Sequence, residues 1–198
     1  MGAALSARRL WRHIPPMVPP GRRGPLRQLG QRIGDAREPR GYAWKAVDDV
    51  LREAERSAAV THDHPEGIKG AQAVALGVLL ARGGMSKTDI RDELTARFKY
   101  DLGGTIDAIR PEYAFDVSCQ GSVPEAIICF LDTGDAEQAI RAAVSLGGDA
   151  DTQASIAGAL AVAFDGGASA ALVGQARKRM TPDMLDVLDR FEARFPGR

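Results

Sequence analysis

The 198-residue sequence has few of the features that mark disulfide frameworks, membrane spans or nucleic-acid-binding surfaces. Its two cysteines, Cys119 and Cys129, are too few for a disulfide framework or an all-cysteine zinc site, which indicates a reducing compartment such as the cytoplasm. No apolar run reaches the roughly 18–20 residues of a membrane helix, and the best candidate is 71–81. Basic and acidic residues number 26 each, so the net charge does not indicate nucleic-acid binding. We therefore expect neither a membrane nor a nucleic-acid partner.

The balanced charge hides an uneven distribution. Residues 1–40 hold nine arginines, no lysine and two acids, Asp35 and Glu38, a net charge of +7 that leaves −7 for residues 41–198. The same segment has five prolines before position 30 and no sustained helical or strand period. We expect residues 1–40 to be a leader outside the folded domain. It is open whether this leader is a transit peptide, a disordered arm or sequence never selected to fold.

Strict alternation of apolar and polar residues, the mark of a strand, is also missing beyond Gly41. Apolar residues there recur at intervals of three and four, which predicts an all-helical domain over residues 41–198. The expected helices are 46–59, 68–79, 86–98, 105–109, 126–131, 135–144, 154–163 and 181–195. Because the helix 154–163 is rich in alanine and apolar almost all round, we expect it to lie at the centre.

The strongest candidate site is the sequence Asp149-Ala150-Asp151-Thr152, which follows Gly147-Gly148 and leads into the alanine-rich helix. Two carboxylates and a hydroxyl are hard oxygen ligands of the kind that Mg²⁺ prefers. The glycines give the preceding backbone the freedom that such a loop needs. Aspartate and threonine are equally favoured as helix caps, so capping is the alternative interpretation.

Two further segments carry reactive side chains. Residues 61–67 contain His62, Asp63 and His64, which could ligate a metal or contact a ribose, or could simply connect two helices. Residues 119–122 contain Cys119 and Ser122, which suggest a nucleophile with a histidine as base. Ser122 is better explained as the cap of a helix that Glu125 supports.

Aromatic residues make up only 6% of the chain. Tyr100, Tyr113 and Phe115 could stack on a base or ribose, but core packing is the commoner role of such residues.

Three segments together resemble the ADP-ribosylglycohydrolase family, which is related to dinitrogenase reductase-activating glycohydrolase. They are THDHPEGIKGAQAVAL (61–76), FDVSCQGSVPEAIICFL (115–131) and SLGGDADTQASIAGALAVAF (145–164). The resemblance implies a compact orthogonal helical bundle with a dinuclear Mg²⁺ or Mn²⁺ centre. It also implies metal-dependent hydrolysis of the N- or O-glycosidic bond between ADP-ribose and an acceptor.

The resemblance assigns roles to individual residues. Asp149, Asp151 and Thr152 match the metal-binding motif, with the two aspartates taking part in catalysis. His62 matches a histidine on the ribose side of the cleft, and Gly147, Gly148, Gly121 and Ser122 match substrate-binding positions. The implied partner is an ADP-ribosylated protein or a small molecule that contains ADP-ribose.

The chain departs from the family pattern before Gly41. Family members also contribute metal ligands from a paired-aspartate motif, and residues 1–40 contain only Asp35 and Glu38. We therefore expect an N-terminally incomplete bundle and an incomplete metal centre. The alternative function is a non-catalytic member that binds ADP-ribose or a partner, or a truncated gene product. A bundle without its preceding helices should expose apolar surface around Ile156, Leu160 and Ala163, and should self-associate.

Overall fold

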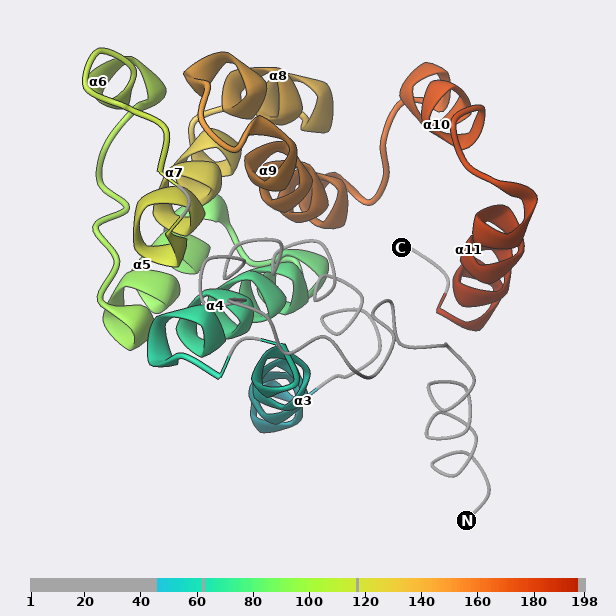
Figure 1. Ribbon diagram of the computed structural model, residues 1–198, viewed down its shortest axis with the longest axis horizontal. Helices are drawn as coiled ribbons and strands as arrows, with labels where there is room; N and C mark the ends of the chain where they lie inside the picture. The colour runs from blue at the N-terminus through green and yellow to red at the C-terminus, as the bar shows by residue number, and fades with distance from the viewer. Residues whose placement is uncertain (1–45, 62, 117, 196–198) are drawn as a thin grey trace.

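The computed structural model describes residues 46–61, 63–116 and 118–195, and within these ranges the chain forms helices and no strands (Figure 1). The helices are α3 (Val47–Ala59), α4 (Pro65–Arg82), α5 (Lys87–Phe98), α6 (Ile106–Ile109), α7 (Cys119–Leu131), α8 (Ala136–Leu146), α9 (Ala150–Asp165), α10 (Ala170–Arg177) and α11 (Pro182–Arg194). The expected all-helical fold is confirmed for this part of the chain. The predicted leader, residues 1–40, lies outside the described residues. None of the helices in the described ranges has both the length and the apolar character that a bilayer span requires.

Side-chain caps fix the start of several helices where the sequence predicted them. The Ser86 hydroxyl accepts a hydrogen bond from the Asp89 N–H at 3.1 Å and donates one to the Asp89 carboxylate at 2.7 Å, which caps the start of α5. Asp135 accepts from the Gln138 N–H at 2.8 Å at the start of α8. These caps satisfy backbone donors that have no partner within the helix.

Two helix predictions are corrected. The cap of α7 is Ser118 rather than Ser122, because the Ser118 hydroxyl accepts from the Gly121 N–H at 3.1 Å. Ser122 lies inside α7, where its hydroxyl donates to the Ser118 carbonyl at 2.8 Å. Both serines can cap a helix, and the choice of Ser118 adds a turn to it. The other correction is α10, which the apolar spacing did not predict and which Ser169 caps at the Leu172 N–H.

Helix α9 is the centre of the bundle and packs against α4, α7 and α8 (Figure 1). Two glycines allow this close approach. A Cβ atom on Gly77 of α4 would lie 2.6 Å from Leu160 Cδ2, and a Cβ atom on Gly158 of α9 would lie 2.9 Å from Ile140 Cγ1. The predicted central position of the alanine-rich helix is therefore confirmed, with glycine at two of its contact points.

The expectation of exposed apolar surface on α9 is wrong. Ile156, Leu160 and Ala163 are all buried. The cause is that α4, α7 and α8, which belong to the described part of the chain, already enclose the central helix. Exposed apolar surface on α9 therefore gives no reason to expect self-association, which stays an untested prediction.

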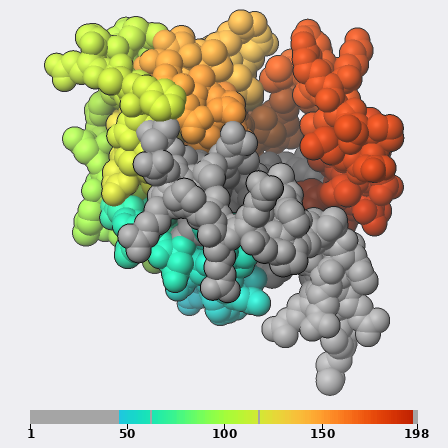
Figure 2. Space-filling view, in the orientation of Figure 1, coloured from blue at the N-terminus to red at the C-terminus, as the bar shows by residue number. Residues whose placement is uncertain are grey.

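Helices α10 and α11 form a pair beside the bundle, drawn in red in Figures 1 and 2. The Arg177 guanidinium of α10 pairs with Asp189 of α11 and approaches Glu192 at 4.0 Å. Neither helix contains a buried residue. The apolar residues Leu185, Leu188 and Phe191 of α11, and Phe195 just after it, are only half-buried.

The close contact at Gly77 gives a stability prediction. We expect Gly77→Ala to have a free energy of unfolding about 1–3 kcal/mol lower than Gly174→Ala, because the new Cβ atom must displace the buried Leu160 side chain. Gly174→Ala is the matched control, because a Cβ atom there would have no atom within 4 Å and both substitutions gain the same helix propensity of about 1 kcal/mol. Urea denaturation of both variants measures the difference. Equal free energies of unfolding for the two variants would contradict the packing of α4 on α9.

Candidate functional site

The turn from α8 into α9, residues 147–152, is called here the acidic turn. Gly147 and Gly148 have φ angles of +84° and +70°, which favour glycine over any residue with a side chain. Gly148 is also sterically confined, because a Cβ atom there would lie 3.0 Å from Cε1 of Tyr113. These two glycines turn the chain so that Asp149 stands at the N-cap position of α9.

Asp149 occupies the cap position, but its side chain makes no capping hydrogen bond. The N–H and hydroxyl of Thr152 approach it closely enough to favour its ionised form without reaching hydrogen-bonding geometry. The pKa of Asp149 is nevertheless raised, first by burial and then by the neighbouring carboxylate of Asp151. Two carboxylates thus lie beside each other at the start of a buried helix.

Thr152 follows these carboxylates and is 1% exposed. Its hydroxyl oxygen is buried and has no hydrogen-bond partner within the part of the chain that the structure describes. A divalent cation held by Asp149 and Asp151 would offset their repulsion and give this hydroxyl a partner. The three groups therefore fit Mg²⁺ or Mn²⁺ as part of a ligand set. Across residues 46–61, 63–116 and 118–195, no three histidine, cysteine, aspartate or glutamate side chains form a metal-binding group.

A second group of residues lies at the start of α7, where Ser118 is the N-cap and residues 119–121 form the first turn. The Ser118 N–H donates to the Asp116 carboxylate at 2.6 Å. A Cβ atom on Gly121 would lie 2.6 Å from Asp116 Cγ, so only glycine leaves room for this carboxylate. The N–H of Gly121 is bound by Ser118 and its carbonyl accepts from the Tyr113 hydroxyl at 3.1 Å. The N–H and carbonyl of Gly121 are thus both hydrogen-bonded within the protein, and the role of this glycine is to leave space for the Asp116 carboxylate.

Tyr113 connects the first turn of α7 to the acidic turn. Its hydroxyl donates to the Gly121 carbonyl and accepts a hydrogen bond from Nε2 of Gln153, which is fully buried next to Thr152. Burial raises the pKa of Tyr113 to about 12, so the hydroxyl keeps its proton at neutral pH. The Tyr113 side chain thus links Gly121 in α7 to Gly148 and Gln153.

A family model described as ADP-ribosylglycohydrolase matches residues 38–193. The chain belongs to the ADP-ribosylglycohydrolase family. The matched range contains α7, the acidic turn and α9, so the resemblance in the three sequence segments is confirmed. The roles that this resemblance assigns to single residues remain predictions.

The histidine, cysteine and serine residues that the sequence of this ADP-ribosylglycohydrolase family member offered as candidates do not form a second site in the described residues. His62 lies outside the described residues. His64 caps α4, with its Nδ1 accepting from the Glu66 N–H at 3.3 Å. The side chains of Cys119 and Ser122 are buried, and the Ser122 hydroxyl is held by the Ser118 carbonyl, which does not favour a nucleophile at either position.

Sequence reasoning missed the polar residues around Tyr113. Glu125 was interpreted as support for a helix cap, but it lies one turn beyond Gly121 inside α7. Its Oε2 atom is buried without a hydrogen-bond partner in the described part of the chain. Burial, with a smaller effect of Asp116, raises the pKa of Glu125. Gln153 carried a recognisable signal, because it is a polar residue that immediately precedes an apolar helix face.

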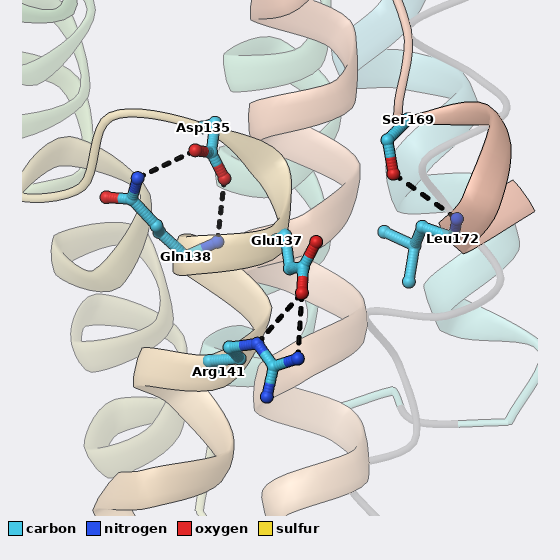
Figure 3. A network of polar contacts seen from close by, with 6 residues as sticks. All are labelled: Asp135, Glu137, Gln138, Arg141, Ser169 and Leu172. Atoms are coloured by element: carbon cyan, nitrogen blue, oxygen red, sulfur yellow. Dashed lines mark hydrogen bonds and ion pairs between the residues drawn. The ribbon is translucent and has the colours of Figure 1, made fainter.

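A hollow of about 400 Å³ lies elsewhere, between α8 and α10. Figure 3 shows two of its polar lining residues paired with each other: the Arg141 guanidinium donates twice to Glu137, at 2.7 and 3.0 Å. The third, Ser145, accepts from Arg110 at 2.9 Å. Asp135 likewise binds Gln138, and Ser169 binds the Leu172 N–H. None of the acidic-turn residues lines this hollow. It therefore offers no unpaired group to a ligand.

The raised pKa of Glu125 predicts a pH-dependent stability difference. When the pKa of a carboxyl is higher in the folded chain than in the unfolded chain, the free energy of unfolding falls as pH rises from the unfolded pKa through the folded pKa. We expect Glu125→Gln to stabilise the fold by up to about 1 kcal/mol near pH 7.5, after allowance for solvent screening, and to have no such effect near pH 4. Thermal unfolding at both pH values measures this. A variant that is less stable than the unmodified chain near pH 7.5 would show that the carboxylate is needed in its charged form.

Proposed function

We propose that this chain is a divalent-cation-dependent hydrolase that cleaves the N- or O-glycosidic bond between ADP-ribose and an acceptor. The observation that carries this proposal is the acidic turn, where Asp149 and Asp151 lie beside the unpartnered, buried hydroxyl of Thr152. Family membership supplies the reaction class. The cation is Mg²⁺ or Mn²⁺, and the substrate is an ADP-ribosylated protein or a small molecule that contains ADP-ribose.

Each part of the site has a role in this proposal. Asp149, Asp151 and Thr152 hold the cation, which when bound supplies Lewis-acid polarisation of the ribose hydroxyls and a water molecule. The N-terminus of α9, where Asp149 makes no capping hydrogen bond, meets the diphosphate beside Gly147 and Gly148. Phe115, 70% exposed and next to Asp116 in the chain, is the aromatic ring available to stack on the adenine. His62 remains the predicted contact on the ribose side.

The two cysteines support the proposal that the protein is located in the cytoplasm. Cys119 and Cys129 are both buried and form no disulfide with each other, which suits a reducing compartment.

A second candidate function is binding of ADP-ribose without hydrolysis. It is favoured by the small ligand set, because the described ranges contain no group of three or more acidic, histidine or cysteine side chains around one point. Two carboxylates suffice to hold a cation weakly, but they place a nucleophilic water less firmly than a full set. Turnover separates the two candidates.

Removal of Asp151 tests the proposal. We expect Asp151→Asn to weaken Mn²⁺ binding by more than about tenfold and to abolish cation-dependent hydrolysis of ADP-ribosylated arginine or serine, because a ligand is lost. Asp48→Asn is the matched control, since Asp48 is also an acid in the first turn of a helix, α3. Isothermal calorimetry measures the first effect and release of ADP-ribose the second.

The outcomes distinguish the candidates. Hydrolysis by the unmodified chain that Asp151→Asn loses and Asp48→Asn keeps supports the hydrolase. ADP-ribose binding without turnover at high protein concentration supports the binding protein. Absence of Mn²⁺ binding by the unmodified chain contradicts the metal site in both.

A further inference from the structure

Tyr113 lies between the acidic turn and the first turn of α7, and its side chain contacts both. Its ring lies over Gly148 of the acidic turn, where a Cβ atom would be 3.0 Å from Cε1 and 3.4 Å from the hydroxyl oxygen. Its hydroxyl donates to the Gly121 carbonyl at 3.1 Å. The same oxygen accepts from Gln153, 40 residues further along the chain. One side chain therefore contacts α7, the acidic turn and the first turns of α9.

The two hydrogen bonds of this hydroxyl are directional. A phenol has a single proton, so donation to Gly121 leaves the oxygen lone pairs to accept from Gln153. Gln153 is fully buried, and its Oε1 atom has no partner in the described part of the chain, so the bond to Tyr113 is the one that holds its amide. Gln153 directly follows Thr152 in the sequence. The hydrogen bond that holds Gln153 to Tyr113 therefore also fixes the position of the acidic turn.

Burial adds to this constraint. The pKa of Tyr113 is raised to about 12, chiefly by burial, and the nearby carboxyl groups of Glu125, Asp116 and Asp149 act in the same direction. The ring is half-buried, so the hydrogen bonds are partly shielded from water. A hydroxyl with no proton to lose near neutral pH keeps the same donor direction throughout.

We propose that Tyr113 is a positioning residue that fixes the acidic turn against Gly121 in the first turn of α7, so that both act on the same ADP-ribose. This inference rests on the proposed function for its purpose, while the contacts that carry it are independent of that function. Tyr113 acts through Gln153 and Gly121 and touches no reacting atom itself. Packing of the ring alone would be kept by phenylalanine, whereas positioning needs the hydroxyl.

The test compares four proteins by their Mn²⁺ dissociation constants, measured by electron paramagnetic resonance. These are Tyr113→Phe, Gln153→Met, the double variant and the control Tyr100→Phe. Tyr100 is also buried, but its hydroxyl has no hydrogen-bond partner in the described part of the chain. We expect about tenfold weaker Mn²⁺ binding for each of the first two variants, because outer partners of a metal site orient its ligands. The double variant should bind Mn²⁺ no more weakly than Tyr113→Phe, because Tyr113→Phe already removes the bond that Gln153→Met removes.

A second readout does not require a metal. Hydrogen exchange of the amides in residues 147–153 should become faster in Tyr113→Phe and stay unchanged in Tyr100→Phe, with circular dichroism showing both proteins folded. If the unmodified chain binds no Mn²⁺, the proposed function fails, and the exchange rates still decide the role of Tyr113. Unchanged exchange in Tyr113→Phe would overturn the inference. So would additive losses of Mn²⁺ affinity in the double variant.

Discussion

The close packing of α9 against α4, α7 and α8 is the constraint on which the rest of the structure depends. Small residues make this packing possible, since a methyl group at Gly77 or Gly158 would overlap Leu160 or Ile140. The Ile156 and Leu160 side chains of this helix are fully buried. Its N-terminus is consequently held in a fixed place beside the N-terminal half of α7.

The candidate site is a consequence of that placement. A central helix needs a tight entry, which Gly147 and Gly148 provide with left-handed backbone angles. The entry leaves Asp149 and Asp151 beside one another, where their mutual repulsion and burial favour either a proton or a cation. Tyr113 and Gln153 then join this entry to the first turn of α7. The fold thus concentrates unsatisfied polar groups at one end of an apolar helix.

The sequence predicted the local features well. Helical spacing, the cap at Ser86 and the glycine-rich entry to α9 are encoded within a few residues, and the structure contains all three. The sequence did not predict contacts between distant residues. Gln153 and Tyr113 are 40 residues apart, and neither belongs to a short motif. Ser118 and Ser122 are both good caps, and only the packing of α7 decides between them. The burial of Leu160 likewise depends on three other helices.

The central claim is that the acidic turn holds a divalent cation. Anomalous diffraction from crystals soaked in Mn²⁺ and ADP-ribose tests it most directly, because manganese scatters anomalously and the light atoms around it do not. The account predicts an anomalous peak within bonding distance of the carboxylates of Asp149 and Asp151 and of the Thr152 hydroxyl, with the ribose of ADP-ribose against it. A map without a peak beside those oxygens would contradict the account, whether or not the nucleotide is bound.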